Sequence, residues 1–125
     1  MSLLLDTHIF LWVVADDRRL TAQARQLILG ARQVCVSTVS IWEIAIKSRL
    51  GKIRVDPVDA DREIRICGFR ELNLNNRHAI QAASLPLHHR DPFDRLLIAQ
   101  AMTEPLHLLT ADVRLAAYSE LVITI

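Results

Sequence analysis

The chain has 125 residues, enough for one domain and too few for two of ordinary size. Hydrophobic residues make up 51% of it and charged residues 23%, a composition typical of a soluble globular protein and not of a disordered, collagenous or coiled-coil chain. The 15 basic and 14 acidic side chains leave a net charge of +1, so any affinity for nucleic acid or a membrane has to come from a local patch.

The pattern of cysteines and apolar runs indicates the compartment. Cys35 and Cys67 are the only cysteines, and neither lies in a CxxC or zinc-binding spacing, which is typical of a reducing compartment. The longest wholly apolar run, residues 9–15, is far shorter than the ~20 residues that a membrane span requires. No basic region precedes Asp6, which argues against a signal peptide. We therefore expect a cytoplasmic protein without a membrane partner.

Short apolar runs alternate with helix-length segments along the whole chain. In chain order, the pattern predicts a strand at 2–5, helices at 7–15 and 21–30, a strand at 34–37, helices at 38–50 and 56–67, a strand at 69–74, helices at 75–84 and 91–104, a strand at 106–109, a short helix at 112–117 and a strand at 121–125. This alternation builds a parallel sheet with helices on both faces. We expect one α/β domain over residues 1–125.

The segment from 38 to 50 is apolar on nearly every side, and it includes Trp42. A helix that is hydrophobic all round is buried in a core or in a subunit interface. Since one small domain does not easily hide so much apolar surface, we expect a homodimer.

Acidic residues stand where the predicted strands end. Asp6 follows the first strand, Asp112 comes three residues after the fourth, and Glu43 lies in the helix after the second. Asp94 falls in the first turn of another helix, on the wheel beside Ile98 and the apolar stripe, so it should point inward. Ligands of parallel sheets bind beyond the carboxyl ends of the strands, which makes these acids candidates for one site.

Each acid also has a purely structural interpretation. Asp6 can be a helix N-cap, and this is as probable as a functional role. Ser40-x-x-Glu43 matches a capping box, and Glu43 to Lys47 is a favourable i,i+4 pair, so both interpretations of Glu43 stay open. For Asp91, which precedes a proline, the N-cap interpretation is favoured.

Converging carboxylates would need a counter-charge. Two of them about 5 Å apart repel by roughly 3 kcal/mol at an effective dielectric of 20. They could share protons, pair with Lys or Arg, or hold a divalent cation. An all-oxygen set selects hard ions, Mg²⁺ with Mn²⁺ as a possible substitute, and such an ion can activate water against a phosphodiester.

Four blocks in register point to a known family. The chain resembles a PIN-domain ribonuclease of the VapC toxin type, from bacterial type II toxin-antitoxin systems, in LLLDTH at 3–8, SIWEIAIKSRLGKI at 40–53, LPLHHRDPFDRLLIAQA at 85–101 and LLTADVRLAAY at 108–118. The resemblance runs from end to end. It implies a three-layer α/β/α sandwich with a short, mostly parallel sheet, a Mg²⁺-dependent endoribonuclease site and an antitoxin whose peptide occupies a groove and delivers a basic side chain to the acidic pocket.

The family's acidic positions fall on Asp6, Glu43, Asp94 and Asp112, and the resemblance makes them the metal-binding and catalytic set. Asp91 is three residues from the third acid and is a candidate assistant, while Thr110 matches a small hydroxyl residue that precedes the fourth acid. The departures, Glu104-Pro105 in place of a Gly-containing turn and a divergent tail after Tyr118, do not touch these acids.

RNA approaching such a pocket needs nearby cations. Candidates are Arg90 and Arg95 beside the third acid, with Lys47, Arg49 and Arg114 near the others, although each could equally be an ordinary surface residue. His88 and His89 are weaker candidates for phosphate contact.

Two other functions remain open. A phosphoacceptor receiver domain has this length and holds Mg²⁺ with carboxylates, but it needs paired acids after the first strand and a lysine near the end, which this chain lacks. A PIN-like module that binds without catalysis is the second. Such modules tend to lose acids, whereas all four are present here.

Overall fold

Five short strands form one parallel sheet in the computed structural model, which describes residues 1–88 and 90–125. Their order is β3-β2-β1-β4-β5, and every neighbouring pair is parallel. The strands are β1 (Ser2–Leu5), β2 (Gln33–Ser37), β3 (Arg70–Leu72), β4 (His107–Thr110) and β5 (Val122–Thr124). Each predicted strand is present, although the third is shorter than expected. The predicted phosphate contact of His89 lies outside the described residues.

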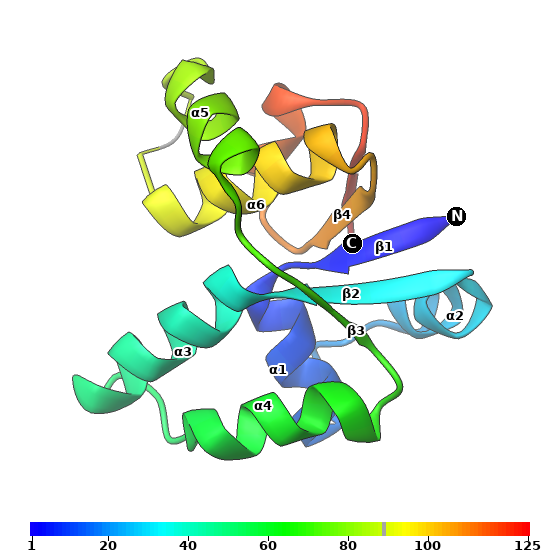
Figure 1. The fold of residues 1–125 in the computed structure, drawn as a ribbon. Helices are drawn as coiled ribbons and strands as arrows, with labels where there is room; N and C mark the ends of the chain where they lie inside the picture. The colour runs from blue at the N-terminus through cyan, green and yellow to red at the C-terminus, as the bar shows by residue number, and fades with distance from the viewer. Residues whose placement is uncertain (89) are drawn as a thin grey trace.

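Helices cover both faces of the sheet, as predicted (Figure 1). They are α1 (Thr7–Ala15), α2 (Ala22–Gly30), α3 (Thr38–Arg49), α4 (Pro57–Ile66), α5 (Asn76–Ser84), α6 (Pro92–Thr103) and the 3₁₀ helix η1 (Val113–Tyr118). In Figure 1, α5 and α6 lie on one side of the sheet, whereas α1 and α4 lie on the other. Helices on both faces of one sheet confirm the predicted three-layer α/β/α architecture. None of the helices in the described ranges is long and apolar enough to cross a membrane.

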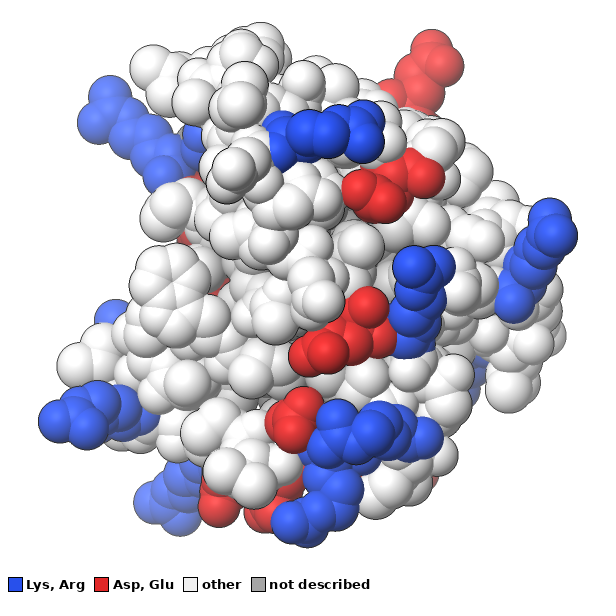
Figure 2. Space-filling model, in the orientation of Figure 1, with Lys and Arg blue, Asp and Glu red and all other residues white. Residues whose placement is uncertain are grey.

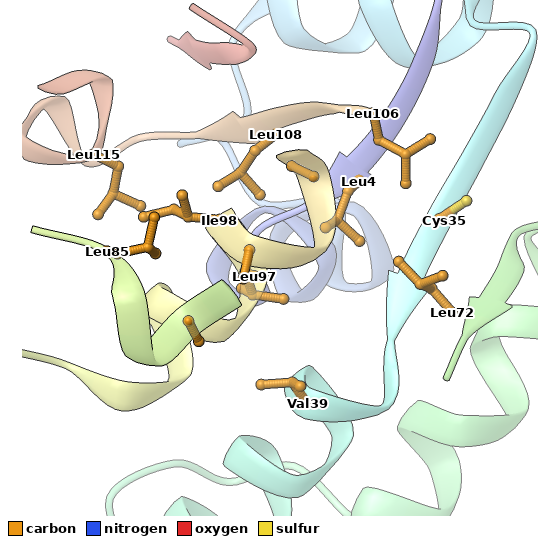
Figure 3. Close-up of a cluster of buried hydrophobic side chains, with 13 residues drawn as sticks. Leu4, Cys35, Val39, Leu72, Leu85, Leu97, Ile98, Leu106, Leu108 and Leu115 are labelled. Carbon is orange, nitrogen blue, oxygen red and sulfur yellow. The ribbon is translucent and has the colours of Figure 1, made fainter. Parts of the chain in front are cut away.

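Alternation along the central strand divides the core into two clusters. Leu3 and Leu5 face the cluster built with α1, α2 and α4, whereas Leu4 faces the one built with α5, α6 and η1 (Figure 3). All three leucines are fully buried. Because β1 is covered on both faces, its sequence is continuously apolar instead of alternating with polar residues.

Two local predictions need correction. The N-cap of α3 is Ser37, whose side chain accepts a hydrogen bond from the Val39 amide, so Ser40 lies inside the helix and the predicted Ser40–Glu43 capping box is wrong. The strand expected at 69–74 is only Arg70–Leu72, because β3 lies at the edge of the sheet and the chain then leads to Asn75, the N-cap of α5.

The order of strands creates a switch point at β1. The chain proceeds from β1 outward through β2 to β3 and then returns to add β4 on the other side of β1. The connections that leave β1 and β4 therefore diverge at the carboxyl end of the sheet, where ligand crevices form in such folds. Asp6 follows β1 and Thr110 ends β4, so both residues stand at this point.

Candidate active site

An open pocket of about 630 Å³ lies at the switch point. The structure brings all four predicted acids and Asp91 to its lining, although they come from four different connections. The remaining lining residues are His8, Trp12, Arg19, Lys47, Ala111, Val113 and Arg114. The pocket therefore gathers five carboxylates around one hollow, as the sequence predicted for four of them.

Asp6 is the most enclosed aspartate of this pocket. It is the N-cap of α1, where its Oδ1 accepts a hydrogen bond of 2.7 Å from the Thr7 amide, and only 6% of the residue is exposed. Burial raises the pKa of Asp6 above its ordinary value, although hydrogen bonds from Thr110 and Thr7 act in the opposite direction. The nearby charge of Glu43 raises it further. Asp6 therefore caps α1 and lines the pocket at the same time.

Thr110 connects two of the acids. Its hydroxyl donates a hydrogen bond of 2.6 Å to Asp6 Oδ2 and accepts one of 3.0 Å from the Asp112 amide. Thr110 is fully buried at the end of β4. It therefore orients the Asp6 carboxylate and ties the start of the Asp112 connection to it.

Glu43 is buried on α3 with two different partners. Its Oε1 lies 2.7 Å from Thr7 Oγ1, and its Oε2 accepts a hydrogen bond of 2.5 Å from Lys47 Nζ. Only 3% of Glu43 is exposed. The predicted i,i+4 pair with Lys47 is confirmed.

The other acids stand at or near the N-termini of α6 and η1. Asp91 is the N-cap of α6 and accepts hydrogen bonds from the amides of Phe93 and Asp94, which confirms the favoured structural interpretation, yet it also lines the pocket. Asp94 is half-buried in the first turn of α6 and lines the pocket too. Asp112 caps η1 and forms an ion pair with Arg114.

The predicted basic residues divide into two groups. Lys47 and Arg114 line the pocket, whereas Arg90 and Arg95 lie together along a separate hollow beside α5 and α6. The Arg95 guanidinium donates to the carbonyl oxygens of Ala82, Leu85 and Pro86, so it caps the end of α5. RNA contact by Arg90 and Arg95 stays a prediction, and it would have to occur outside the acidic pocket.

The visible charged surface has no broad basic patch. Figure 2 shows Lys and Arg side chains interspersed with Asp and Glu over this face of the molecule. This mixture of charges on the visible face matches the near-neutral composition.

The chemistry of the pocket fits a hydrated hard cation. Its possible ligands are oxygens, and burial of Asp6 beside Glu43 leaves a negative charge that a divalent ion would offset. Within the described ranges, no three His, Cys, Asp or Glu side chains are spaced to hold an ion directly. Mg²⁺ suits this spacing because it usually keeps several waters between itself and the protein.

Two polar residues that support this site, Thr7 and Ser40, were not predicted from the sequence. Thr7 and Ser40 are both buried, and their hydroxyl groups lie 2.8 Å apart beneath Glu43. Both residues lie in apolar segments, where small hydroxyl residues are easily taken for helix or core positions. One pattern could have identified them: Ser40 stands about one helical turn before the buried Glu43, and Thr7 directly follows the buried Asp6.

The fold and the pocket define a class of α/β protein with a carboxylate-lined crevice at its switch point. Comparison with known families identifies that class: the PIN domain family matches residues 3–121. The chain is also 30% identical over 119 residues to Ribonuclease VapC22 of Mycobacterium tuberculosis, which covers 94% of this chain and 92% of that protein. The chain therefore belongs to the PIN domain family and to its VapC type, which sets aside the receiver-domain alternative.

Solved structures agree with this fold. A toxin-antitoxin complex from Klebsiella pneumoniae contains a chain that is 21% identical, with a TM-score of 0.68 and coverage of 97% of this chain and 95% of that one. VapBC2 from Rickettsia felis, bound to a DNA fragment from its promoter, contains one that is 13% identical, with a TM-score of 0.66 and coverage of 100% and 98%.

Proposed function

We propose that this protein is a Mg²⁺-dependent endoribonuclease and the toxin of a toxin-antitoxin pair. The observation that carries the proposal is the meeting of Asp6, Glu43, Asp91, Asp94 and Asp112 around one pocket at the switch point. The similarity to Ribonuclease VapC22 over most of both chains supports RNA as the substrate. Mn²⁺ is expected to substitute for Mg²⁺, since both are hard ions with oxygen ligands.

In this proposal Asp6, Asp94 and Asp112 hold the ion directly or through water, and Asp91 assists from the N-cap of α6. A bound divalent ion supplies charge stabilisation and an activated water for attack on the RNA phosphorus. Thr110 holds the carboxylate of Asp6 in position, since its hydroxyl donates to Oδ2. Asp6 suits the role because its hydrogen-bond partners are a neutral amide and a neutral hydroxyl, so its charge remains for a cation.

Cleavage of RNA by the purified protein tests this function. Structured RNA incubated with Mg²⁺ should be cut, and a chelator should stop the reaction. Asp6→Asn and Asp94→Asn should each abolish cleavage, whereas Asp59→Asn, at an exposed position of α4, should leave it unchanged. Retained cleavage in the first two variants would refute the assignment. Absence of both cleavage and metal uptake in the natural protein would favour the non-catalytic binding module instead.

An apolar groove beside the acidic pocket is the proposed place of the antitoxin. The groove holds about 420 Å³ between α1 and α4, and residues such as Leu11, Val14 and Val55 line it. It shares three lining residues with the acidic pocket, His8, Trp12 and Arg19, so the two hollows adjoin. A peptide whose apolar residues fill the groove can therefore place a basic side chain among the carboxylates, where its charge is complementary.

Binding of the antitoxin encoded with this chain tests the groove. Val14→Glu should weaken the complex by at least about tenfold, because it places a charge on an apolar contact. Leu29→Glu is a matched control, since Leu29 is 85% exposed on α2 and lies outside the groove. Equal affinity of both variants for the antitoxin would place the partner elsewhere.

We also propose a homodimer that covers α3. Trp42 is 57% exposed, and its ring packs edge-on against Phe93 of α6 with 5.4 Å between ring centroids. A second copy that buries this surface would offset the cost of exposing so large an aromatic ring. Light scattering should report a dimer that Trp42→Glu converts to a monomer, whereas Ile66→Glu on α4 should not. A natural protein that stays monomeric at every concentration would remove the dimer.

A further inference from the structure

Glu43 is held from one side by a chain of two hydroxyl groups. Thr7 Oγ1 lies 2.7 Å from Glu43 Oε1 and 2.8 Å from Ser40 Oγ. A carboxylate can only accept, so Thr7 donates its single proton to Glu43, and Ser40 must then donate to Thr7. All three residues are at most 3% exposed. The chain therefore has one direction, from Ser40 through Thr7 to Glu43, and it fixes the orientation of the carboxylate.

The other carboxylate oxygen of Glu43, Oε2, forms an ion pair with the Lys47 ammonium group. Lys47 Nζ lies 2.5 Å from Glu43 Oε2, one helical turn further along α3, and its side chain lines the acidic pocket. The Lys47 ammonium group lies in the electrostatic field of Glu43, Asp91 and Asp94, which line the same pocket.

Lys47 is the least exposed of the three Lys and Arg side chains that line the pocket. Its side chain is 31% exposed, compared with 65% for Arg114 and 69% for Arg19. The two arginines are therefore placed at the solvent-exposed rim, whereas Lys47 reaches the interior. A phosphate that enters a ring of carboxylates is repelled, and a preorganised cation inside that ring is the group that lowers the repulsion and stabilises charge developing during cleavage.

We propose that Glu43 acts through Lys47: the chain from Ser40 through Thr7 to Glu43 holds the Lys47 ammonium in the pocket, where it contacts a non-bridging oxygen of the RNA phosphate. Lys47 is then a catalytic residue, and Glu43, Thr7 and Ser40 are positioning residues. This rests on the proposed ribonuclease function, and it removes Glu43 from the metal ligands that the family resemblance implied. The charge of Glu43 is matched by Lys47 in a partly buried pair, whereas Asp112 pairs with the largely exposed Arg114 and Asp6 has only neutral hydrogen-bond partners.

A charge-neutral double variant separates this role from metal binding. Glu43→Gln with Lys47→Met removes one negative and one positive charge, so it leaves the net charge of the pocket unchanged. If Glu43 positions Lys47, calorimetry without RNA should give a Mn²⁺ Kd within about threefold of the natural protein. If Glu43 is a metal ligand, loss of its carboxylate should weaken Mn²⁺ by about 10- to 100-fold or more, and that result would overturn the proposal.

Single-turnover cleavage at saturating RNA provides the second measurement. Lys47→Met should slow cleavage by about 100-fold, as loss of one preorganised stabilising group does, and Glu43→Gln should slow it by a comparable factor. The double variant should be no slower than Lys47→Met alone, because residues that act as a unit are not additive. Lys52→Met makes the same substitution at an exposed lysine that does not line the pocket, and this matched control should cleave at the natural rate.

Two further measurements test the hydroxyl chain and the phosphate contact separately. Thr7→Val should lower the cleavage rate while Thr7→Ser restores it, since serine keeps the donor. In a chelator, where RNA binds without being cut, Lys47→Met should lower the slope of log K against log salt by about 0.7 for a single-stranded RNA, the value of one phosphate contact. An unchanged slope together with unchanged cleavage in Lys47→Met would refute this inference alone, whereas a natural protein that cuts no RNA would refute the proposed function.

Discussion

Thr110 Oγ1 donates a hydrogen bond of 2.6 Å to Asp6 Oδ2 across 104 residues of sequence. The contact forms because β1 and β4 are neighbours in the sheet, with Leu5 paired to Leu109, so the residues that follow each strand meet at its carboxyl end. The Asp6 amide also donates to the Leu109 carbonyl. The acid is thereby fixed to β4 through both its backbone and its side chain.

Thr110→Val tests the value of this contact. Valine has nearly the same shape but no hydroxyl, so Asp6 Oδ2 and the Asp112 amide both lose a partner. A hydrogen bond to a charged group is worth about 1.5–3 kcal/mol, which predicts a fall in the RNA cleavage rate of about 10- to 100-fold. Thr124→Val is the matched control, because Thr124 is the partner of Thr110 on β5. Similar rates for both variants would show that Thr110 has no part in the site.

The fold could be predicted because its strands and helices differ in length and are separated by clear caps. Strands buried on both faces gave continuous apolar runs, and Asp6, Thr21, Asp56 and Asp91 each stand before a helix and do cap it. The capping box at Ser40 failed because Ser37, three residues earlier, offers the same chemistry at the true end of β2. A local sequence pattern cannot show which of the two serines caps α3, because that depends on where β2 ends.

The site could be predicted only in part, for a physical reason. Acids at strand ends are visible in the sequence, and parallel topology brings strand ends together. The support beneath them is not visible, since Thr7 reaches Glu43 only after α1 and α3 have packed against each other. Likewise, the sequence predicted Arg95 as an RNA contact but did not reveal that its guanidinium would meet three carbonyl groups at the end of α5.

Asp6→Asn should stabilise the protein near pH 7 when divalent metal is removed with a chelator. Burial raises the folded pKa of Asp6 above its ordinary value of 3.8, so the folded state favours the protonated form. The stability that Asp6 contributes is therefore fully present below the unfolded pKa and is lost as pH rises through the higher folded pKa. Asparagine avoids this loss because it carries no charge.

Denaturation of both proteins across a pH series measures the effect. The difference in unfolding free energy between Asp6→Asn and the natural protein should be largest near neutral pH and should shrink as the pH falls toward the ordinary pKa of an aspartate. Asp59→Asn, at an exposed position of α4, should show no such trend. A natural protein that is more stable than Asp6→Asn at pH 7 in the chelator would contradict the buried-charge argument.

Divalent metal should stabilise the natural protein through the same carboxylates. Ligand that binds only the folded state adds about 1.4 kcal/mol at ten times its Kd and about 2.7 kcal/mol at one hundred times. Mg²⁺ or Mn²⁺ should therefore raise the thermal midpoint of the natural protein, with little effect on Asp94→Asn. Asp61→Asn is the matched control, because Asp61 pairs with Arg65 on the surface of α4. Equal shifts in all three proteins would indicate nonspecific ion effects.

Glu104 should contribute to folding through a buried histidine far from the pocket. His78 is fully buried, and its Nδ1 accepts a hydrogen bond from the Asn75 amide, so the proton must be on Nε2 in the neutral ring. Nε2 lies 2.6 Å from Glu104 Oε2, which accepts that proton's hydrogen bond. Glu104→Ala leaves a buried N–H without this acceptor and should cost about 1–3 kcal/mol of unfolding free energy in urea. Glu104→Gln keeps an acceptor and should retain most of the stability, as should Glu120→Ala at an exposed position. If Glu104→Ala unfolds at the same urea concentration as Glu120→Ala, water replaces the carboxylate and the pair does not hold α5 to α6.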